Sequence, residues 1–177
     1  TLNVTEVQRR EDELNLIRQQ GFQRGEDGKI QGTGYDAPAL IKVPYDILVT
    51  LLNLFCSLSG STPVEVFYLL EVVARMPYFS YISMLHLYET LGWWRRSADV
   101  KSIHFAEEVN EYHHLLLMET LGGDQRWFVR FIAQHAAIIY YWFNVLLFFT
   151  SPKLAYGFSV LLETHAVETY QVFIEEN

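Results

Sequence analysis

The 177-residue sequence lacks the features on which several protein classes depend. It has a single cysteine, Cys56, so neither an intrachain disulfide nor a cysteine-pair zinc site is available, and an oxidising compartment is not implied. Only 19% of its residues are charged, the formal net charge is -8, and no basic patch appears. Nucleic acid binding is therefore not expected, because contact with phosphates needs grouped basic side chains.

A glycine-rich nucleotide-binding motif, a hydrolase nucleophile motif and any clear strand pattern are also missing from the sequence. Half of the residues are apolar and 15% are aromatic. A chain of this length and apolarity can bury a core as one domain, and we expect it to contact lipid. It begins at Thr1 without a signal peptide and stops at Asn177 directly after a helical pattern, which predicts a fragment.

Apolar patterns predict five or six helices. Residues 1–41 are polar and rich in glycine from residue 21 onward, which predicts an irregular arm, and residues 42–177 are predicted to form an incomplete helical bundle domain. Thr62 and Pro63 are typical of a helix start, whereas Pro77 predicts a kink or break near Met76. The predicted helices lie at residues 43–58, 63–91, 100–121, 126–150 and 154–174.

Residues 128–150 are apolar over enough length to cross a bilayer. Polar side chains at Arg130, Gln134, Tyr141 and Asn144 nevertheless fall on one stripe of this helix. The one-sided stripe favours a helix at the membrane interface over a spanning helix, and both interpretations stay open.

Two other stretches have the character of an interface. The segment at 43–58 is predicted to be too short and too polar for a span and fits a helix at a membrane surface or against a core. Trp93-Trp94-Arg95-Arg96 is typical of an aromatic and basic cluster at the headgroup level, with tight loop packing as the alternative.

The clearest candidate for chemistry is Asn110-Glu111-Tyr112-His113-His114. Glu111 and His114 project from one face of a helix on consecutive turns, so they can hold one metal ion together. A Glu-x-x-His pair is the half-site of carboxylate-bridged di-iron proteins, in which other helices supply further glutamates. A solvated Glu and His at this spacing would look the same, so partners on other helices are needed.

Two isolated glutamates, Glu71 and Glu163, occur in otherwise apolar helical stretches on either side of this motif. An acid in such surroundings has to be paired or functional, since a buried charge is costly. Together with Glu111 they predict a shared metal site, and snorkelling surface glutamates are the alternative. Tyr170 follows Glu163 by two helical turns and could place a phenol near the metal, or be an ordinary packed tyrosine.

Other acids and histidines compete for these roles. Glu107 could be a ligand or a neighbour of one, Glu89 lies at a helix end where solvent is expected, and Glu108 is expected to be solvated. His113 lies off the Glu111 face. The histidines at 86, 104, 135 and 165 are expected to be satisfied in a core or interface, although His165 lies close enough to Glu163 to bond to a ligand.

At these residues the chain resembles the alternative oxidase superfamily, and within it the plastid terminal oxidase branch. The resemblance covers about residues 63–174. It rests on LEVVARMPYF at 70–79, HLYETLGWWRR at 86–96, HFAE at 104–107, NEYHHL at 110–115 and ETHAVETY at 163–170.

The resemblance implies an all-α, ferritin-like di-iron carboxylate four-helix bundle with additional membrane-interfacial helices. It implies two iron ions, with Tyr170 as a redox or quinol-pocket tyrosine. The implied ligands are Glu71, Glu111, His114 and Glu163. Candidates for positions beside the ligands or the quinol are Asn110, Thr169 and His165.

The same resemblance implies a quinol:oxygen oxidoreductase that oxidises two quinols and reduces dioxygen to two waters without pumping protons. The expected partners are plastoquinol, dioxygen, one leaflet of the thylakoid membrane and a second copy of the chain. A cyanobacterial membrane is the alternative location. A lipid-directed di-iron hydroxylase or desaturase, and a non-catalytic interfacial helical protein, are the alternative functions.

The sequence departs from the family pattern in three places. The family's second Glu-x-x-His pair is expected beyond residue 177, so this chain alone is not expected to hold a complete di-iron centre. Val66 stands where the family usually has an arginine near the quinol, and Val72 replaces a threonine after the first ligand. Because Val66 lacks the charged side chain of that arginine, the contacts to the quinol are expected to differ from the family pattern.

Overall fold

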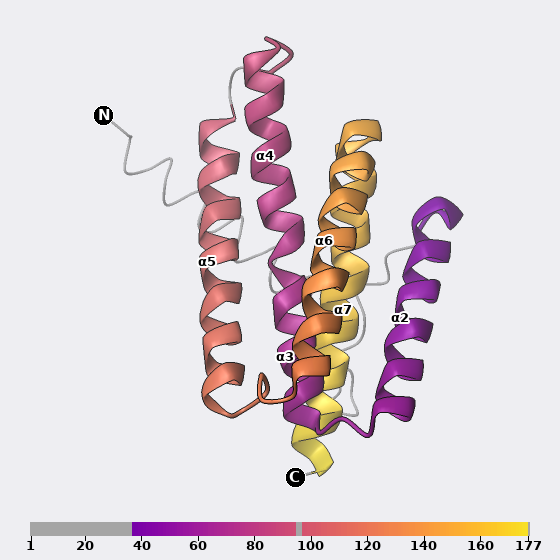
Figure 1. The fold of residues 1–177 in the computed structure, drawn as a ribbon. Coiled ribbons are helices and arrows are strands. Elements are labelled where there is room, and N and C mark those ends of the chain that lie inside the picture. Colours follow the sequence, from indigo (N-terminus) through magenta and orange to yellow (C-terminus); the bar gives the residue numbers. More distant parts are fainter. Residues whose placement is uncertain (1–36, 95–96, 177) are drawn as a thin grey trace. The chain divides into compact units, whose positions relative to one another are not determined.

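A computed structural model describes residues 37–94 and 97–176, and side chains are described up to residue 174. All regular structure in these residues is helical, which confirms the all-α prediction for the part described (Figure 1). The helices are α2 (Ala39–Ser59), α3 (Pro63–Ala74), α4 (Met76–Thr90), α5 (Ala98–Thr120), α6 (Trp127–Thr150) and α7 (Pro152–Glu176).

The chain divides into two compact units. Residues 46–156 form one unit, which contains α3 to α6, most of α2 and the start of α7. The other unit includes residues 37–45 and α7 from Gly157 onward, and within it the ring of Tyr45 lies edge-on to His165 with centroids 6.2 Å apart. Most of the predicted arm at 1–41 lies outside the described residues, and α2 already begins at Ala39.

The start of α3 follows from its local sequence. Thr62 accepts a hydrogen bond from the backbone N–H of Glu65, and the Glu65 carboxylate accepts one from the N–H of Thr62 at 2.8 Å. This reciprocal capping box satisfies two donors that a helix start would otherwise expose, and Pro63 needs no hydrogen bond at the first helical position. The predicted helix start is confirmed.

The predicted break near Met76 is also confirmed. Helix α3 ends at Ala74, Arg75 separates the two helices, and α4 begins at Met76 with Pro77 in its first turn. Pro77 has no N–H to continue the hydrogen bonds of α3. At its other end α4 stops at Thr90, and Gly92 has a positive φ of 73°, as a glycine after a helix C-terminus allows.

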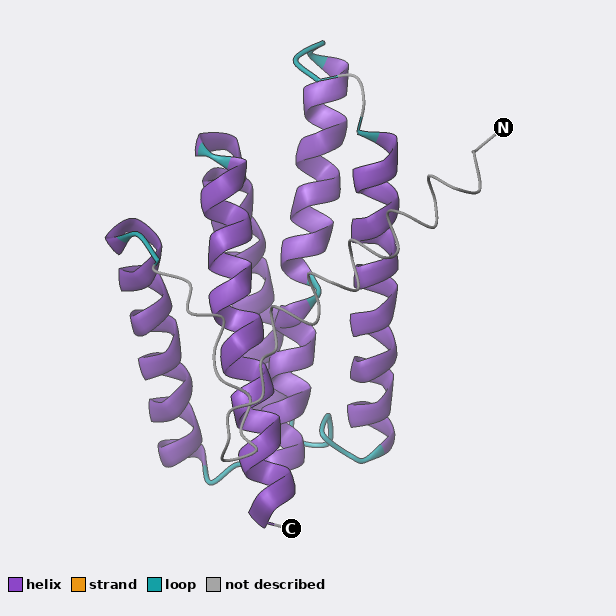
Figure 2. Cartoon of the chain, turned by 180° about the vertical axis from the view of Figure 1, so that it is seen from behind, coloured by secondary structure: helices purple, strands orange, loops and turns teal. Residues whose placement is uncertain are grey.

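Within the unit of residues 46–156, α3 and α4 follow each other end to end. Helix α5 packs on one side of this pair and α6 on the other (Figures 1 and 2). An aromatic core joins α4 to the end of α6. It is formed by Tyr81, Met84, Leu85, Phe148 and Ala155. The Tyr81 hydroxyl donates a hydrogen bond to the carbonyl of Ala155 at 2.9 Å, so the start of α7 is held against α4.

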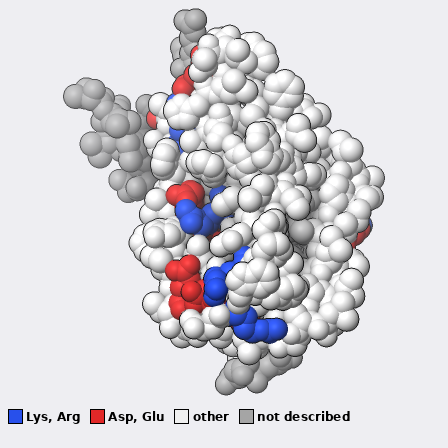
Figure 3. Space-filling model, viewed as in Figure 1, with Lys and Arg blue, Asp and Glu red and all other residues white. Residues whose placement is uncertain are grey.

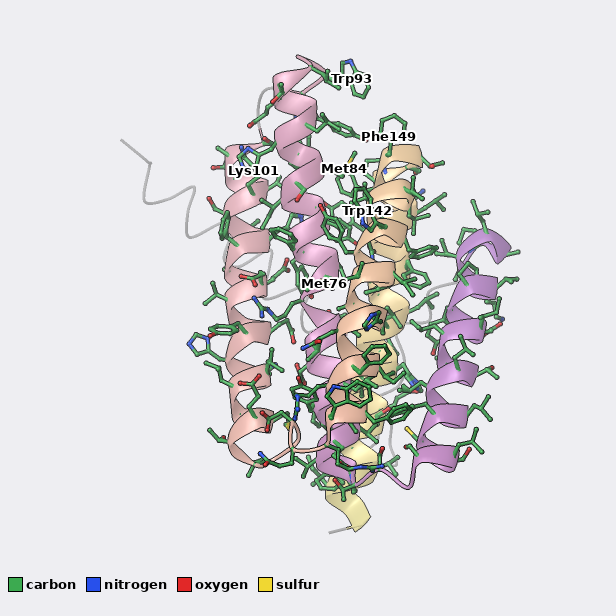
Figure 4. All side chains as sticks on the ribbon, in the orientation of Figure 1. Met76, Met84, Trp93, Lys101, Trp142 and Phe149 are labelled. Carbon is green, nitrogen blue, oxygen red and sulfur yellow. The ribbon has the colours of Figure 1, made fainter. Side chains whose placement is uncertain are left out.

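Polar contacts tie the end of α4 to the start of α5. The Glu89 carboxylate accepts hydrogen bonds from the ammonium of Lys101, labelled in Figure 4, and from the hydroxyl of Ser97. The bond from Lys101, followed by that from Ser97, lowers the pKa of Glu89. Glu89 therefore lies near a helix end, as the sequence predicts, and there it pairs with Lys101 and Ser97.

Gly123 lies in the turn after α5, where a side chain has no room. A Cβ atom there would lie 2.6 Å from Cβ of Tyr68 and 2.9 Å from the carbonyl oxygen of Val64. We expect Gly123→Ala to lower the free energy of unfolding by about 3 kcal/mol, because backbone and a Cβ cannot move aside cheaply. Chemical denaturation would measure the loss; Gly60→Ala, with a φ of 56° but open space around it, should cost only about 1 kcal/mol. Equal losses would contradict the steric explanation.

Two described helices, α2 and α6, are long and apolar enough to cross a membrane by length and composition. Helix α2 is longer than the 43–58 segment predicted from sequence. Large apolar side chains are exposed along α6, including Trp127, Ile139, Trp142, Leu146 and Phe149. The length of these helices and their exposed apolar side chains agree with the predicted contact to lipid.

Trp93, just after α4, combines packing with exposure. Its ring lies 5.6 Å from that of Tyr88 and 6.2 Å from that of Phe149, and Figure 4 shows Trp93 and Phe149 at the same end of α4 and α6. More than half of its surface is nevertheless exposed. Both predicted roles, loop packing and an interface, fit this position; Arg95 and Arg96 lie outside the described residues.

Candidate metal centre

The candidate metal centre lies between α3 and α5. Glu71 is in the last turn of α3, and the residue is only 4% exposed. Glu111 and His114 lie on successive turns of α5, as the Glu-x-x-His spacing predicts. Figure 3 shows small mixed groups of acidic and basic side chains on the side where α5 lies, on a face otherwise largely free of charge.

The three side chains converge. One potential ligand atom from each of Glu71, Glu111 and His114 lies within 4.8 Å of the others, and these are the only such group in the described residues. Nδ1 of His114 is 3.3 Å from Oε2 of Glu111 and 3.7 Å from Oε2 of Glu71. The structure thus brings together three of the four residues that were expected to bind iron.

This donor set fits iron. Carboxylate oxygen and imidazole nitrogen are ligands that iron accepts, and two carboxylates offset the charge of a divalent ion. A buried carboxylate such as Glu71 is also stabilised by a nearby cation. The side chain of His114 is 49% exposed, so one side of the group is open.

Glu107 is not part of the group. Its Oε2 lies 2.8 Å from Nδ1 of His104, and Nε2 of that ring lies 2.9 Å from the hydroxyl of Tyr156. A carboxylate only accepts hydrogen bonds, so a neutral His104 donates through Nδ1 and accepts the Tyr156 proton at Nε2. The structure gives no support to Glu107 as a ligand, and the prediction of His104 as a satisfied core histidine agrees with these contacts.

Aromatic rings surround His104. Those of Tyr78, Tyr81 and Tyr156 have centroids 6.3, 5.3 and 5.6 Å from the imidazole. Burial, followed by the negative charge of Glu107, raises the pKa of Tyr156 to about 12. The phenol therefore stays protonated at physiological pH and remains a hydrogen-bond donor to His104.

Glu108 is not solvated, contrary to the sequence prediction. Its Oε1 accepts hydrogen bonds from Nε of Arg75 at 3.0 Å and from Nη2, and its side chain is 19% exposed. The guanidinium carbon of Arg75 also lies 4.7 Å from the ring centroid of Tyr112. Sequence reasoning missed this pair because its members are 33 residues apart and only packing of α3 against α5 brings them together.

The remaining candidates on α4 and α5 lie outside the group. Nδ1 of His113 is 2.7 Å from the carbonyl oxygen of Val109 on the exposed side of α5. Asn110 is exposed, and its place beside the ligands stays a prediction. His86 is largely exposed at 4.0 Å from Glu89.

Four predicted residues lie on α7, in the unit described separately. They are Glu163, His165, Thr169 and Tyr170. The hydroxyl of Thr169 donates to the carbonyl oxygen of His165 at 2.8 Å, a bond within the helix. Their roles at the metal centre and the quinol pocket stay predictions.

The sequence was compared with known proteins and structures. A protein named ubiquinol oxidase 4, chloroplastic/chromoplastic, from Arabidopsis thaliana is 56% identical over 109 residues, which make up 62% of this chain and 31% of that protein. The chain therefore matches only about a third of the length of this relative. No solved structure matches the chain.

The family described as Alternative oxidase matches residues 37–177, which is most of the sequence and includes the whole candidate metal centre. The same stretch contains every motif on which the resemblance was based. The chain belongs to the alternative oxidase family.

Proposed function

We propose that this chain is part of a membrane-bound quinol:oxygen oxidoreductase and supplies one side of its di-iron centre. The observation that carries the proposal is the convergence of Glu71, Glu111 and His114 within 4.8 Å. Family membership and the name of the plastid relative, a ubiquinol oxidase, support it.

Glu163 is proposed as a further ligand. Its position as an isolated acid in an otherwise apolar stretch of α7, together with the family resemblance, supports this role. The other ligands of a ferritin-like bundle would come from a second Glu-x-x-His pair, which this sequence does not contain.

When bound, the two iron ions would supply the dioxygen binding and the electron transfer that reduction to water requires. The chain itself would supply the side chains that bind and orient the iron ions. Glu71 and Glu111 would ligate as carboxylates, and His114 would ligate as a neutral imidazole. The burial of Glu71 keeps water away from its side of the centre, and the open side at His114 leaves access for a further ligand.

Two quinols release four protons and four electrons, which balances the reduction of one dioxygen to two waters. Tyr170 is proposed to stand in the quinol pocket, where a phenol can pass a proton or an electron. Asn110, Thr169 and His165 are proposed to surround the ligands or the quinol. Val66 cannot make the charged contact that an arginine would make there, so the quinol headgroup is held without it.

A membrane-bound location is proposed from the apolar exposed side of α6 and the length of α2. These helices would lie in one leaflet and admit the quinol sideways. We propose the thylakoid membrane as the location, plastoquinol as the electron donor and a homodimer as the assembly. These proposals rest on the family resemblance and on the word chloroplastic in the relative's name. Residues 42–177 are proposed to be the bundle domain, preceded by the 1–41 arm.

Oxygen uptake by the full-length protein in liposomes tests this function. We expect uptake that depends on added quinol, with quinone formed in a 2:1 ratio to dioxygen and no hydroxylated lipid. A hydroxylated or desaturated product would instead identify a lipid-directed di-iron enzyme. Iron-loaded protein that consumes no oxygen with any quinol would overturn the proposal.

A further inference from the structure

Helix α5 has more glutamates near its Glu-x-x-His motif than the one that belongs to the candidate metal centre. Glu107, Glu108 and Glu111 occur within five residues, so the helix offers three carboxylates at nearly the same depth. A divalent ion would bind any of them. Some other contact must therefore decide which carboxylate is available to the metal.

Two of the three contact residues outside the candidate metal centre. Glu107 is bonded to His104, and Glu108 is bonded to Arg75 from the junction of α3 and α4. Glu111 is the one that lies with Glu71 and His114. The geometry points to Arg75 as a positioning residue for the metal centre, an inference that rests on the proposed iron-binding function.

Arg75 is placed to act on both sides of the centre. It follows Glu71 by four residues at the end of α3, so the two are separated by one helical turn. On α5 it contacts Glu108 and Tyr112, which lie on one face and bracket Glu111 in sequence. Arg75 therefore fixes the spacing of α3 and α5 at the level where Glu71 and Glu111 must meet.

The charge of Arg75 matters as well as its position. Paired with Glu108, the guanidinium is neutralised and does not repel a cation at the neighbouring group. If Glu108 loses its charge, the positive charge of Arg75 remains close to the site. If Arg75 is lost, Glu108 becomes an additional acid next to the ligands and the α3–α5 contact is weakened.

Titration of the full-length protein with Co²⁺, followed by its visible absorption, tests this inference without oxygen or quinol. We expect Arg75→Met to weaken Co²⁺ binding about tenfold and to change the absorption spectrum, as loss of groups that orient ligands does elsewhere. Glu108→Gln, which keeps a hydrogen-bond acceptor for Arg75, should weaken binding by removing only the charge. Arg75→Lys should recover part of the affinity, since it keeps the charge without the planar fork.

The matched control is Lys101→Met, which removes the ion pair with Glu89 at the far end of α5. It should lower the melting temperature without changing Co²⁺ affinity. If Arg75→Met and Glu108→Gln both bind Co²⁺ with unchanged affinity and spectrum, Arg75 is only structural and the inference is overturned. If the unmodified full-length protein binds no Co²⁺, the metal-centre assignment fails and the inference fails with it.

Discussion

Glu111→Ala and His114→Ala are each expected to weaken Fe²⁺ binding by roughly 100-fold or more. Each change removes a donor from a group of three, and groups that merely orient ligands already contribute about 10- to 100-fold. Neither change should unfold the protein, because His114 is exposed and Glu111, with 15% of its side chain exposed, is not part of the fully buried core. Anaerobic Fe²⁺ titration and metal analysis of the purified full-length protein would measure the loss.

His113→Ala provides the matched control. His113 is the direct neighbour of His114, but its Nδ1 faces the Val109 carbonyl within α5. Iron content should remain at the wild-type level in this variant. If His113→Ala lost iron and His114→Ala kept it, the assignment of the double histidine would be reversed, and full retention in Glu111→Ala would remove the metal centre.

The helices and their ends could be predicted from sequence because their signals are local. The cap at Thr62, the break at Pro77 and the turn at Gly92 each depend on residues within one or two turns. The Glu-x-x-His motif is local too, since helical periodicity alone puts Glu111 and His114 on one face. The addition of Glu71 needed a further argument, namely that an isolated acid among apolar residues requires a partner.

The contacts that select among similar side chains could not be predicted in this way. Arg75 and Glu108 are 33 residues apart, and His104 and Tyr156 are 52 apart. Nothing in the sequence near Glu108 distinguishes a solvated acid from a paired one. Such pairs depend on how α5 packs against other helices, which only the folded chain determines.

His104→Ala is expected to lower the free energy of unfolding by about 2–4 kcal/mol. The change empties a site among three tyrosine rings and leaves the Tyr156 hydroxyl without its acceptor. His86→Ala is the matched control, because that side chain is 61% exposed and should change stability by no more than about 0.5 kcal/mol. Urea denaturation of both variants would measure the difference.

A double-mutant cycle separates the hydrogen bond from ring packing. Tyr156→Phe removes only the hydroxyl, and its coupling with His104→Ala should be about 1–2 kcal/mol. No coupling, or equal losses for His104→Ala and His86→Ala, would contradict the proposed network. His104 lies on the Glu111 face of α5, two turns away, so Fe²⁺ affinity is the decisive second measurement. Unchanged Fe²⁺ affinity in a destabilised His104→Ala protein would show that His104 has a structural role, whereas His114 on the same helix binds metal. The two histidines would then differ only in the residues packed against them.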